Sequence, residues 1–565
     1  MAWKYSIMLY LKLQLTMVRL LFKKGLNAIA SKQANIFSAA FFIIITTIFS
    51  QILGFLKYRL LVSIFGASSD LGVFLASFRI PDFLFQIVIA GALSSAFIPI
   101  FSEYLSKEKR EEAYSFTSSL ITIGITLFVI ISILISIFAY PLSSLIAPGF
   151  SQKELTLMAD LTRILLLTQI FFILGTLVTA ILQSFQHFII PGVASSFYNL
   201  GIIIGLLVFT PILGIHGAVI GVLLGSLLFF VVQLPLLKTV GFRFTPKFNI
   251  ESGVMRIFHL MIPRSLTLLV TQIAITANVA FASFISARAL VIFDLAQSLV
   301  MAPVVLFGQS IAQASFPSLS LKHNNREEFL YIFLSSFTQI LYLTFPISAI
   351  LIVLRIPIVR LFYGAKGFDW FATVDTGKTL AFFAICIFAQ ALMYLLSRAF
   401  FALKDTKTPF IVTLVSVIFN IVSAYYFILI LKLQIYYLAL SFSVASIFSV
   451  VVLIVLLDRK IIIPKLQILY EVSKIALATL VMGFALYIPI KLLDQLVFDT
   501  TRTINLIALT GIASFFGLTA YIFFTWLLDI KEAYFVLSVF KKFGNGKNIL
   551  KQIGELIDGS TKLNP

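Results

Sequence analysis

Ionisable side chains inside long apolar segments are the residues of this sequence best placed to do chemistry. A charge within the hydrocarbon interior of a membrane is costly, so residues of this kind usually serve binding or transport. Lys57 and Arg59 fall late in the first apolar segment, where Lys57 could contact phosphate oxygens as a point charge and Arg59 as a bidentate fork. Alternatively, both long side chains could extend to the outer membrane interface. Further residues of this kind are Asp70, Arg79, Asp82, Arg264, Arg288 and Asp294.

Some of these polar groups also have a purely structural interpretation. Arg79 and Asp82 are three residues apart, on one face of a helix, and could simply pair with each other. Three uncharged polar residues in apolar segments could bind sugar hydroxyls or form hydrogen bonds between helices. These three are Gln86, Gln272 and Asn278.

The sequence gives little support for an enzyme. It contains no D-x-D pair to hold a metal and a diphosphate, and no G-x-x-x-x-G-K-[ST] loop for a nucleotide. Its four histidines are widely scattered, without metal-ligand spacing. We therefore expect neither an enzyme nor a resident cofactor. Work done by this chain would draw on an ion gradient, the membrane potential or the gradient of its substrate.

The elements that must position these residues are membrane-spanning helices. The chain has 565 residues, of which 60% are hydrophobic and 12% charged, and continuous apolar segments of helix-spanning length recur throughout. Because the segments are continuous rather than alternating, they predict helices and exclude a transmembrane β-barrel. The net charge of +19 comes from Lys and Arg between the apolar segments, so it reflects topology and not nucleic-acid binding. The single Cys386 excludes an intrachain disulfide.

Fourteen spans are expected from the apolar segments. Lys and Arg are severalfold more frequent in the N-terminus, the even-numbered loops and the C-terminus than in the odd-numbered loops, which places both termini in the cytoplasm. The basic residues 1–36 suggest an amphipathic surface helix, unless Met17 is the true start. The predicted spans are 37–62, 73–101, 114–140, 157–184, 190–211, 215–237, 254–284, 288–318, 327–354, 373–401, 408–430, 434–457, 472–492 and 502–529.

An internal repeat divides these helices into two lobes. The segment AFIPIFSEYLSKEKREEAYSF has a counterpart in ASFPSLSLKHNNREEFLYIF, so that Pro99 corresponds to Pro317, and Pro191 corresponds to Pro409, each 218 residues later. Chance agreement between prolines is the alternative. Six helices per repeat give lobes in parallel orientation, related by an axis along the membrane normal, with a cavity between them suited to alternating access. The expected units are 1–36, a lobe at 37–237, a lobe at 254–457, two additional helices at 472–529 and a basic tail at 530–565.

The first hairpin resembles the signature of the MurJ/MviN family of lipid II flippases, within the multidrug/oligosaccharidyl-lipid/polysaccharide exporter superfamily. The matching steps are LGF at 53–55, FGAS at 65–68, FRIP at 78–81 and the run from Gly91 to Pro99. Looser similarity extends over VTQIAITANVAFASF, SFPSLS and KDTKTP, so the resemblance covers about residues 37 to 530. It implies a central cavity whose arginines hold the diphosphate and sugar, and a groove at 472–529 for the polyprenyl tail.

The chain departs from this family pattern at the cavity positions. The resemblance implies a basic pair and an acid in the second helix, where this chain has Phe85, Gln86 and Ala90, and an arginine in the eighth, where it has Ser298. The basic position after LGF is kept as Lys57. Asp70, at an acidic family position, is either a gate residue or a solvated loop carboxylate. Our hypothesis is that the missing arginines are partly replaced by Arg264, Arg288 and Asp294.

The function expected from the resemblance is translocation of lipid II, an undecaprenyl-diphosphate-linked glycolipid, from the inner to the outer leaflet of the bacterial cytoplasmic membrane. Three alternatives are a flippase for another polyprenyl-linked saccharide, a cation-coupled drug exporter and an inactive scaffold for cell-wall synthesis. The exporter is disfavoured because that branch usually ends after twelve helices. We expect a monomer whose partners are the lipid substrate and the bilayer, with no nucleic acid.

Overall fold

The computed structural model describes residues 36–87, 97–249, 252–493 and 502–534, and these residues contain helices and no strand. Continuous apolar segments become helices in a membrane because a helix satisfies all its backbone N–H and C=O groups within one segment. The all-α membrane fold expected from the sequence is confirmed.

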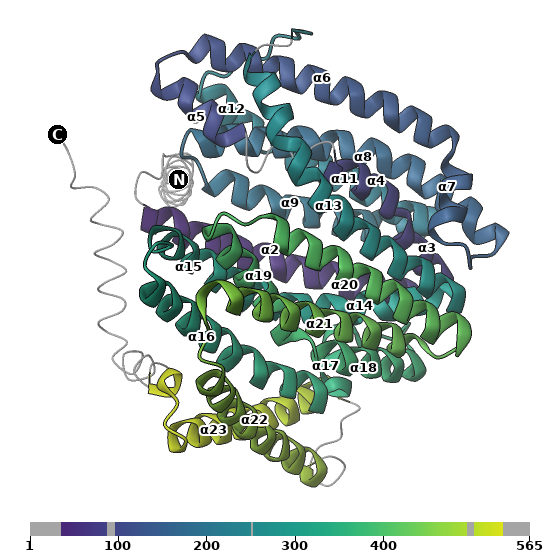
Figure 1. Cartoon of the computed structure of the whole chain (residues 1–565). Coiled ribbons are helices and arrows are strands. Elements are labelled where there is room, and N and C mark those ends of the chain that lie inside the picture. Colours follow the sequence, from purple (N-terminus) through teal and green to yellow (C-terminus); the bar gives the residue numbers. More distant parts are fainter. Residues whose placement is uncertain (1–35, 88–96, 250–251, 494–501, 535–565) are drawn as a thin grey trace, which may run out of the picture.

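The first lobe occupies the upper part of Figure 1, in purple and blue. Its long helix α2 packs against α9, and α9 and α11 pack against each other and enclose the lobe's interior with α8. The helices of this lobe are α2 (Ile36–Phe65), α3 (Ser69–Ser77), α4 (Arg79–Phe85), α5 (Ile98–Ser106), α6 (Arg110–Ile137), α7 (Ala139–Ile146), α8 (Gln152–Ser184), α9 (Ile189–Val208), α10 (Thr210–Leu213), α11 (Ile215–Val231) and α12 (Leu234–Thr239).

Most of the second lobe lies below the first in Figure 1, in teal and green, whereas its helix α13 begins in the upper part and contacts α6 and α7 of the first lobe. Its helix α14 packs against α18 of its own lobe and against α3 of the first lobe, so it is a principal contact between the lobes. The segments of this lobe are α13 (Ser252–Ile285), α14 (Ala287–Pro303), the π-helical η3 (Val304–Gln309), α15 (Ser310–Leu321), α16 (Arg326–Val353), α17 (Arg355–Tyr363), α18 (Trp370–Ala384), α19 (Ile387–Ala402), α20 (Lys407–Tyr425), the π-helical η4 (Tyr426–Ile430) and α21 (Ile435–Ile461).

Two further helices, α22 (Lys465–Leu493) and α23 (Thr503–Leu527), pack against each other at the bottom of Figure 1. Both contact α16 of the second lobe, and α23 also contacts α17. The Tyr521 hydroxyl donates a buried hydrogen bond to the backbone carbonyl of Tyr342, 2.8 Å away, which ties α23 to α16. The pair is therefore an addition to the second lobe.

Within the described residues, twelve helices are long and apolar enough to span a membrane, or thirteen when the bent pair α18 and α19 is taken as one span. That pair, which bends by 40°, is the span expected at 373–401. The span expected at 73–101 is divided into α3, α4 and α5, and its residues 88–96 lie outside the described part. The basic segments 1–35 and 535–565 also lie outside it.

Corresponding helices of the two lobes begin in the same way. Pro191 and Pro409 are each the third residue of their helices, α9 and α20. Helices α6 and α16 both have 28 residues and both begin with the sequence Arg-Glu-Glu. Acidic residues in a first turn are favourable because the helix N-terminus carries a partial positive charge. The repeat seen in the sequence is thus present in the helix boundaries.

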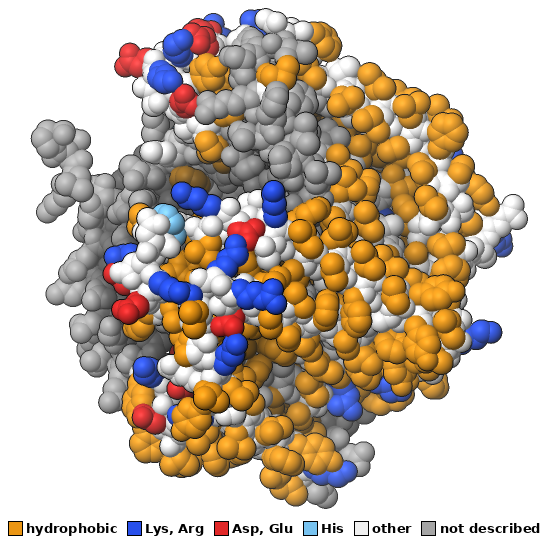
Figure 2. Space-filling view, in the orientation of Figure 1, with side chains coloured by type: hydrophobic (Ala, Val, Ile, Leu, Met, Phe, Trp, Pro, Cys, Tyr) orange, Lys and Arg blue, Asp and Glu red, His pale blue; other side chains and the backbone are white. Residues whose placement is uncertain are grey.

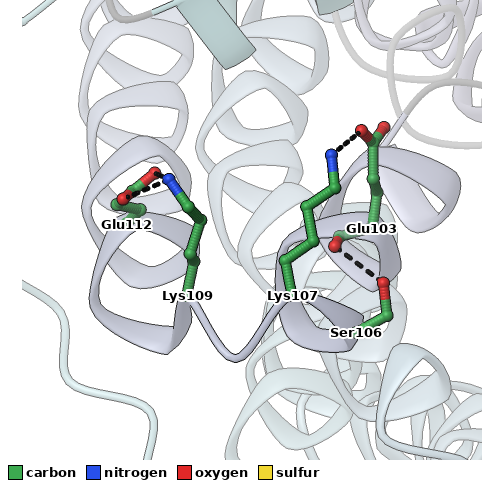
Figure 3. Close-up of polar contacts among 5 residues, drawn as sticks. All are labelled: Glu103, Ser106, Lys107, Lys109 and Glu112. Atoms are coloured by element: carbon green, nitrogen blue, oxygen red, sulfur yellow. Dashed lines mark hydrogen bonds and ion pairs between the residues drawn. The ribbon is translucent and has the colours of Figure 1, made fainter.

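Figure 3 shows the turn between α5 and α6, at which the chain reverses direction. Lys107 pairs with Glu103 at 2.8 Å, and Lys109 pairs with Glu112 at 2.8 Å, so the two lysines fix opposite sides of the turn. Glu108 between them has a φ of 59°. Exposed pairs of this kind contribute at most about 1 kcal/mol, so they orient the turn more than they stabilise the lobe.

The surface separates charge from apolar area along the helix direction. In Figure 2, acidic and basic side chains gather on the left, whereas hydrophobic side chains cover the centre and right. Helix α2 begins and α23 finishes on that left side in Figure 1. We call this side, where α2 begins, the near end, and the opposite side, where α2 finishes with Phe65, the far end. The broad apolar belt is the surface expected of a protein surrounded by lipid.

Candidate functional site

Three adjoining cavities lie between the lobes, and Arg79 of α4 lines all three. Their volumes are about 260, 160 and 10 Å³. The first lobe supplies side chains from α2, α4, α8, α9 and α11, and the second lobe supplies them from α13 and α14. Polar groups converge here within a membrane-spanning bundle, which makes this space the candidate binding site.

Arg79 and Asp294 form an ion pair across the cavity from opposite lobes. The Arg79 guanidinium lies 3.6 Å from the Asp294 carboxylate, and the two side chains are 19% and 16% exposed. The Nε atom of Arg79 is buried without a hydrogen-bond partner. The sequence alternative, an Arg79–Asp82 pair within one helix, is not the ion pair that forms. Arg79 instead connects the lobes and keeps donor capacity for another oxygen.

Lys57 and its neighbour Tyr58 bring a second positive charge to the same wall. Both line the cavity with Asp294. The Tyr58 hydroxyl lies 3.5 Å from an Asp294 carboxylate oxygen, and the Lys57 ammonium lies 4.9 Å from the centre of the Tyr58 ring. Lys57 is therefore placed beside a carboxylate and an aromatic face, without a close ion pair.

Asp82 is the second carboxylate of the cavity, and it is held from its own lobe. The Gln169 side-chain amide on α8 donates a hydrogen bond of 3.1 Å to it. Gln169 is only 7% exposed, so its amide is a fixed donor rather than a surface group. Asp82 is thus anchored within the first lobe, whereas Asp294 reaches across from the second.

The uncharged polar residues expected from the sequence also face this space. Gln86 and Gln272 line the largest cavity, from the first and second lobes respectively, and Asn278 lines the smallest. Asn278 is 3% exposed, and its side-chain oxygen has no hydrogen-bond partner. Amides in these positions can donate to or accept from the hydroxyl groups of a sugar.

Other sequence candidates are placed elsewhere. Arg59 donates a hydrogen bond of 2.8 Å to the backbone carbonyl of Leu361, so it joins α2 to α17 and does not line the cavities. Asp70 is exposed in the first turn of α3 at the far end. Arg288 forms an ion pair of 2.7 Å with Asp369, also at the far end. The side chain of Arg264, on α13, lies outside the described part of the chain.

Replacement of missing arginines by Arg288 is therefore wrong, because this side chain is engaged at the far end. Asp294 does enter the cavity, although as an acid it adds no positive charge. Ser298, where the family resemblance implies an arginine, shares a hydrogen bond of 2.7 Å with the Tyr363 hydroxyl and so ties α14 to α17. Among the described residues, the cavity is consequently less basic than the resemblance implies.

Sequence reasoning missed Tyr58, Gln169 and Tyr198, all of which line the cavities. Gln169 carried a usable signal, since it is a polar residue inside an apolar segment like Gln86 and Gln272. Tyrosines carry no such signal because they are also common at membrane interfaces.

The far end is closed by backbone contacts between the lobes, which we call the far-end seal. A β-carbon at Gly66, whose φ is +64°, would overlap the carbonyl oxygen of Gly367, and one at Gly72 would overlap that of Ala287. The backbone N–H of Gly149 donates a hydrogen bond of 3.1 Å to the Ser283 hydroxyl. On the first-lobe side of each contact, only a glycine allows this approach. The far-end seal consists of Gly66, Gly72, Gly149, Ser283, Ala287 and Gly367.

The arrangement is suited to binding a substrate with anionic and hydroxyl groups. Two cations can hold anionic oxygens, amides can hold hydroxyl groups, and aromatic walls such as Phe172 and Tyr198 can contact apolar faces of a sugar. Among the described residues, no three His, Cys, Asp or Glu side chains are grouped so that they could hold a metal ion.

Comparisons with known proteins show the family of the chain. Residues 61–506 match the family model described as lipid II flippase MurJ. A probable lipid II flippase MurJ of Buchnera aphidicola is 28% identical over 85% of this chain and 95% of its own length. A Thermotoga maritima protein of the same description is 31% identical over 66% of this chain and 76% of its own length.

Solved structures also match this chain. A lipid II flippase MurJ in an inward closed conformation superimposes with a TM-score of 0.72 at 27% identity, covering 86% of this chain and 98% of that one. An inward-facing multidrug resistance MATE family transporter superimposes with a TM-score of 0.61 at 15% identity, over 73% and 94%, so it shares the fold. The chain belongs to the MurJ family of lipid II flippases.

Proposed function

We propose that this protein moves lipid II from the inner to the outer leaflet by alternating access. Membership of the family and the apolar helices make it a multi-pass protein of a bacterial inner membrane that handles a lipid-linked substrate. The observation that carries the proposal is the cavity between the lobes, in which Lys57 and Arg79 face a space enclosed by long apolar helices. In this proposal the chain binds and moves its substrate without chemical conversion, as a monomer.

Each part of lipid II has a suitable contact in this proposal. The diphosphate lies against Lys57 and Arg79, since ammonium and guanidinium groups are strong partners of phosphate oxygens. The sugar lies against the amides of Gln86 and Gln272. The polyprenyl tail lies along α22 and α23, where exposed apolar side chains such as Leu480, Phe484 and Phe515 face the lipid.

The transport cycle would exchange access between the two ends of the bundle. The far-end seal closes one side, which corresponds to the outer side if both termini are cytoplasmic. The charged near end supports that orientation, because cytoplasmic loops are enriched in Lys and Arg. Opening of the far end would require the contacts of Gly66 and Gly72 with the second lobe to separate.

Complementation tests the proposed activity. A bacterium depleted of its own lipid II flippase should grow when this chain is expressed, and should accumulate lipid II in the outer leaflet, measured by its accessibility to an externally added enzyme. Absence of rescue by well-expressed protein, in a strain that its own flippase does rescue, would contradict the proposal.

The orientation has a separate test. Cysteines would be introduced one at a time in a Cys386→Ser background. One would replace Ser106 at the near end, and the other would replace Leu145 at the far end. A membrane-impermeant maleimide added to intact cells should label only the cysteine at 145, and labelling only at 106 would reverse the topology.

A second candidate is a flippase for another polyprenyl-diphosphate-linked saccharide. It is favoured by Phe85 and Gln86, which line the cavity where the family resemblance implies basic residues. Competition for binding between lipid II and such a saccharide lipid, measured on purified protein, would distinguish the two.

A further inference from the structure

Among the described residues, the fixed charges that line the cavities cancel. Of the described residues that line the three cavities, Lys57 and Arg79 are basic, and Asp82 and Asp294 are acidic. A diphosphate diester carries two negative charges, so its entry would leave the site with two uncompensated charges. Burying unpaired charge within a low-dielectric site is strongly unfavourable. Something positive must therefore enter with the head group, or a carboxylate must lose its charge.

Asp294 is the carboxylate best placed to lose its charge. Its contacts with Arg79 and with Tyr58 are 3.6 and 3.5 Å long, and both partners belong to the other lobe. By contrast, the exposed pair of Arg163 and Asp160 closes to 2.6 Å. Asp82 is instead held by Gln169 of its own lobe. Asp294 is thus loosely bound to the same cation that an incoming phosphate would contact.

We propose that Asp294 is the internal counterion of the empty cavity, which gives up Arg79 and Lys57 to the phosphates and takes up one proton as the head group binds. This inference rests on the proposed function. The transferred proton comes from water on the side to which the cavity is open and adds to a carboxylate oxygen of Asp294. The remaining phosphate charge is offset by hydrogen bonds from amides such as Gln86 and Gln272.

Among the described residues, few other groups near Asp294 can titrate between pH 5.5 and 8.5. Lys57 and Tyr58 face it from α2, Arg79 and Asp82 lie on α4, Tyr198 on α9 and Tyr363 at the end of α17. Asn278 and Gln297, from α13 and α14, do not titrate. Tyrosine and arginine ordinarily keep their protons throughout this range. The competing proton acceptors are therefore Lys57 and Asp82, and both can be removed separately.

The test measures binding of a polyprenyl-diphosphate-linked saccharide to the full chain in lipid nanodiscs from pH 5.5 to 8.5. A diphosphate diester does not titrate in this range, so any pH dependence belongs to the protein. Wild-type affinity should fall with rising pH, by up to about tenfold per unit for one linked proton. Calorimetry in two buffers with different ionisation enthalpies should show proton uptake.

Variants assign the proton to a residue. Asp294→Asn should bind with an affinity independent of pH, tighter than wild type at pH 8.5, and without proton uptake. Asp294→Glu should restore the pH dependence. Lys57→Gln and Asp82→Asn should change the affinity but keep its pH dependence. Asp160→Asn, which removes an exposed carboxylate of the first lobe outside the cavities, should match wild type.

Two results would overturn the inference. In the first, wild-type binding is independent of pH, or its pH dependence survives in Asp294→Asn and disappears in Lys57→Gln or Asp82→Asn. Either outcome would exclude Asp294 as the proton acceptor and would leave the proposed function unaffected. In the second, wild-type protein binds no polyprenyl-diphosphate saccharide at any pH, which overturns the proposed function and this inference with it.

Discussion

The far-end seal and the cavity are made of different kinds of contact. The far-end seal brings backbone against backbone, at Gly66 with Gly367 and at Gly72 with Ala287, and leaves no room for a β-carbon. The cavity is lined by long side chains, and its cross-lobe ion pair spans 3.6 Å with a buried Arg79 Nε lacking a partner. The far-end seal therefore depends on shape, and the cavity depends on charge.

This difference separates two ways in which a transporter can fail. Side chains in the cavity can rearrange around a ligand, so a substitution there should change affinity and leave the lobes able to close. Backbone contacts have no such freedom, because interiors are packed at nearly crystalline density. A substitution in the far-end seal should therefore change which conformation is populated and leave the cavity chemistry intact.

The largest expected effect comes from Arg79→Gln. Loss of one partner from a buried charge pair costs about 2–5 kcal/mol, so lipid II affinity should fall at least thirtyfold and complementation should fail. The measurement is binding by purified protein together with growth of the depleted strain. Arg163→Gln, which removes an exposed arginine of the same lobe, is the matched control and should behave as wild type.

A second measurement on the Arg79→Gln protein completes this test: the distance between spin labels at Leu145 and Phe371, exposed positions near the far end in the two lobes. We expect this distance to stay at its wild-type value. If it lengthened as much as in a far-end seal variant, a cavity substitution would also change the conformation, and the two regions would not fail independently.

Gly72→Ala should give the next largest effect. Its methyl group would overlap the Ala287 carbonyl, and overpacking of this kind costs about 1–3 kcal/mol in the closed state. Spin labels at Leu145 and Phe371, exposed positions of the two lobes, should report a longer distance than in wild type. Gly124→Ala is the control, since no atom lies within 4 Å of a β-carbon there. An unchanged distance in Gly72→Ala would show that the contact adapts.

Helices were predictable from the sequence because the membrane imposes one solution on any long apolar segment. The span expected at 190–211 is α9, Ile189–Val208. What hydropathy could not give is where a span breaks, since α18 and α19 together are apolar enough to count as one span despite their 40° bend. The same applies to the division of the second span into α3, α4 and α5.

The cavity residues were predictable one by one, but their partners were not. Lys57, Arg79, Gln86, Gln272, Asn278 and Asp294 all face the cavities. Lys57 and Arg59 are two residues apart, so on a helix with 3.6 residues per turn they cannot share a face, and Arg59 indeed contacts Leu361 instead. Arg79 finds its partner in Asp294, in the other lobe, which no local spacing indicates.

The smallest expected effect comes from Asp369, which supports the far end by charge instead of shape. The Arg288 guanidinium, together with the backbone N–H of Ala372, holds the pKa of Asp369 below its ordinary value. A lowered carboxyl pKa contributes stability above the ordinary value of about 4, and this stability is lost as pH falls through the lowered pKa. Asp369 is 49% exposed, so the contribution should stay below about 1 kcal/mol.

Thermal unfolding of wild type and Asp369→Asn across pH checks this expectation. At pH 6 the melting temperature of wild type should be slightly higher than that of Asp369→Asn. The difference should shrink as pH falls below about 4, because the wild-type carboxyl then becomes neutral. The label distance between positions 145 and 371 should stay at its wild-type value at pH 6. A shift as large as that of Gly72→Ala would mean that the Arg288–Asp369 pair closes the far end, and the distinction between a far-end seal made by backbone shape and a cavity made by charge would then be lost.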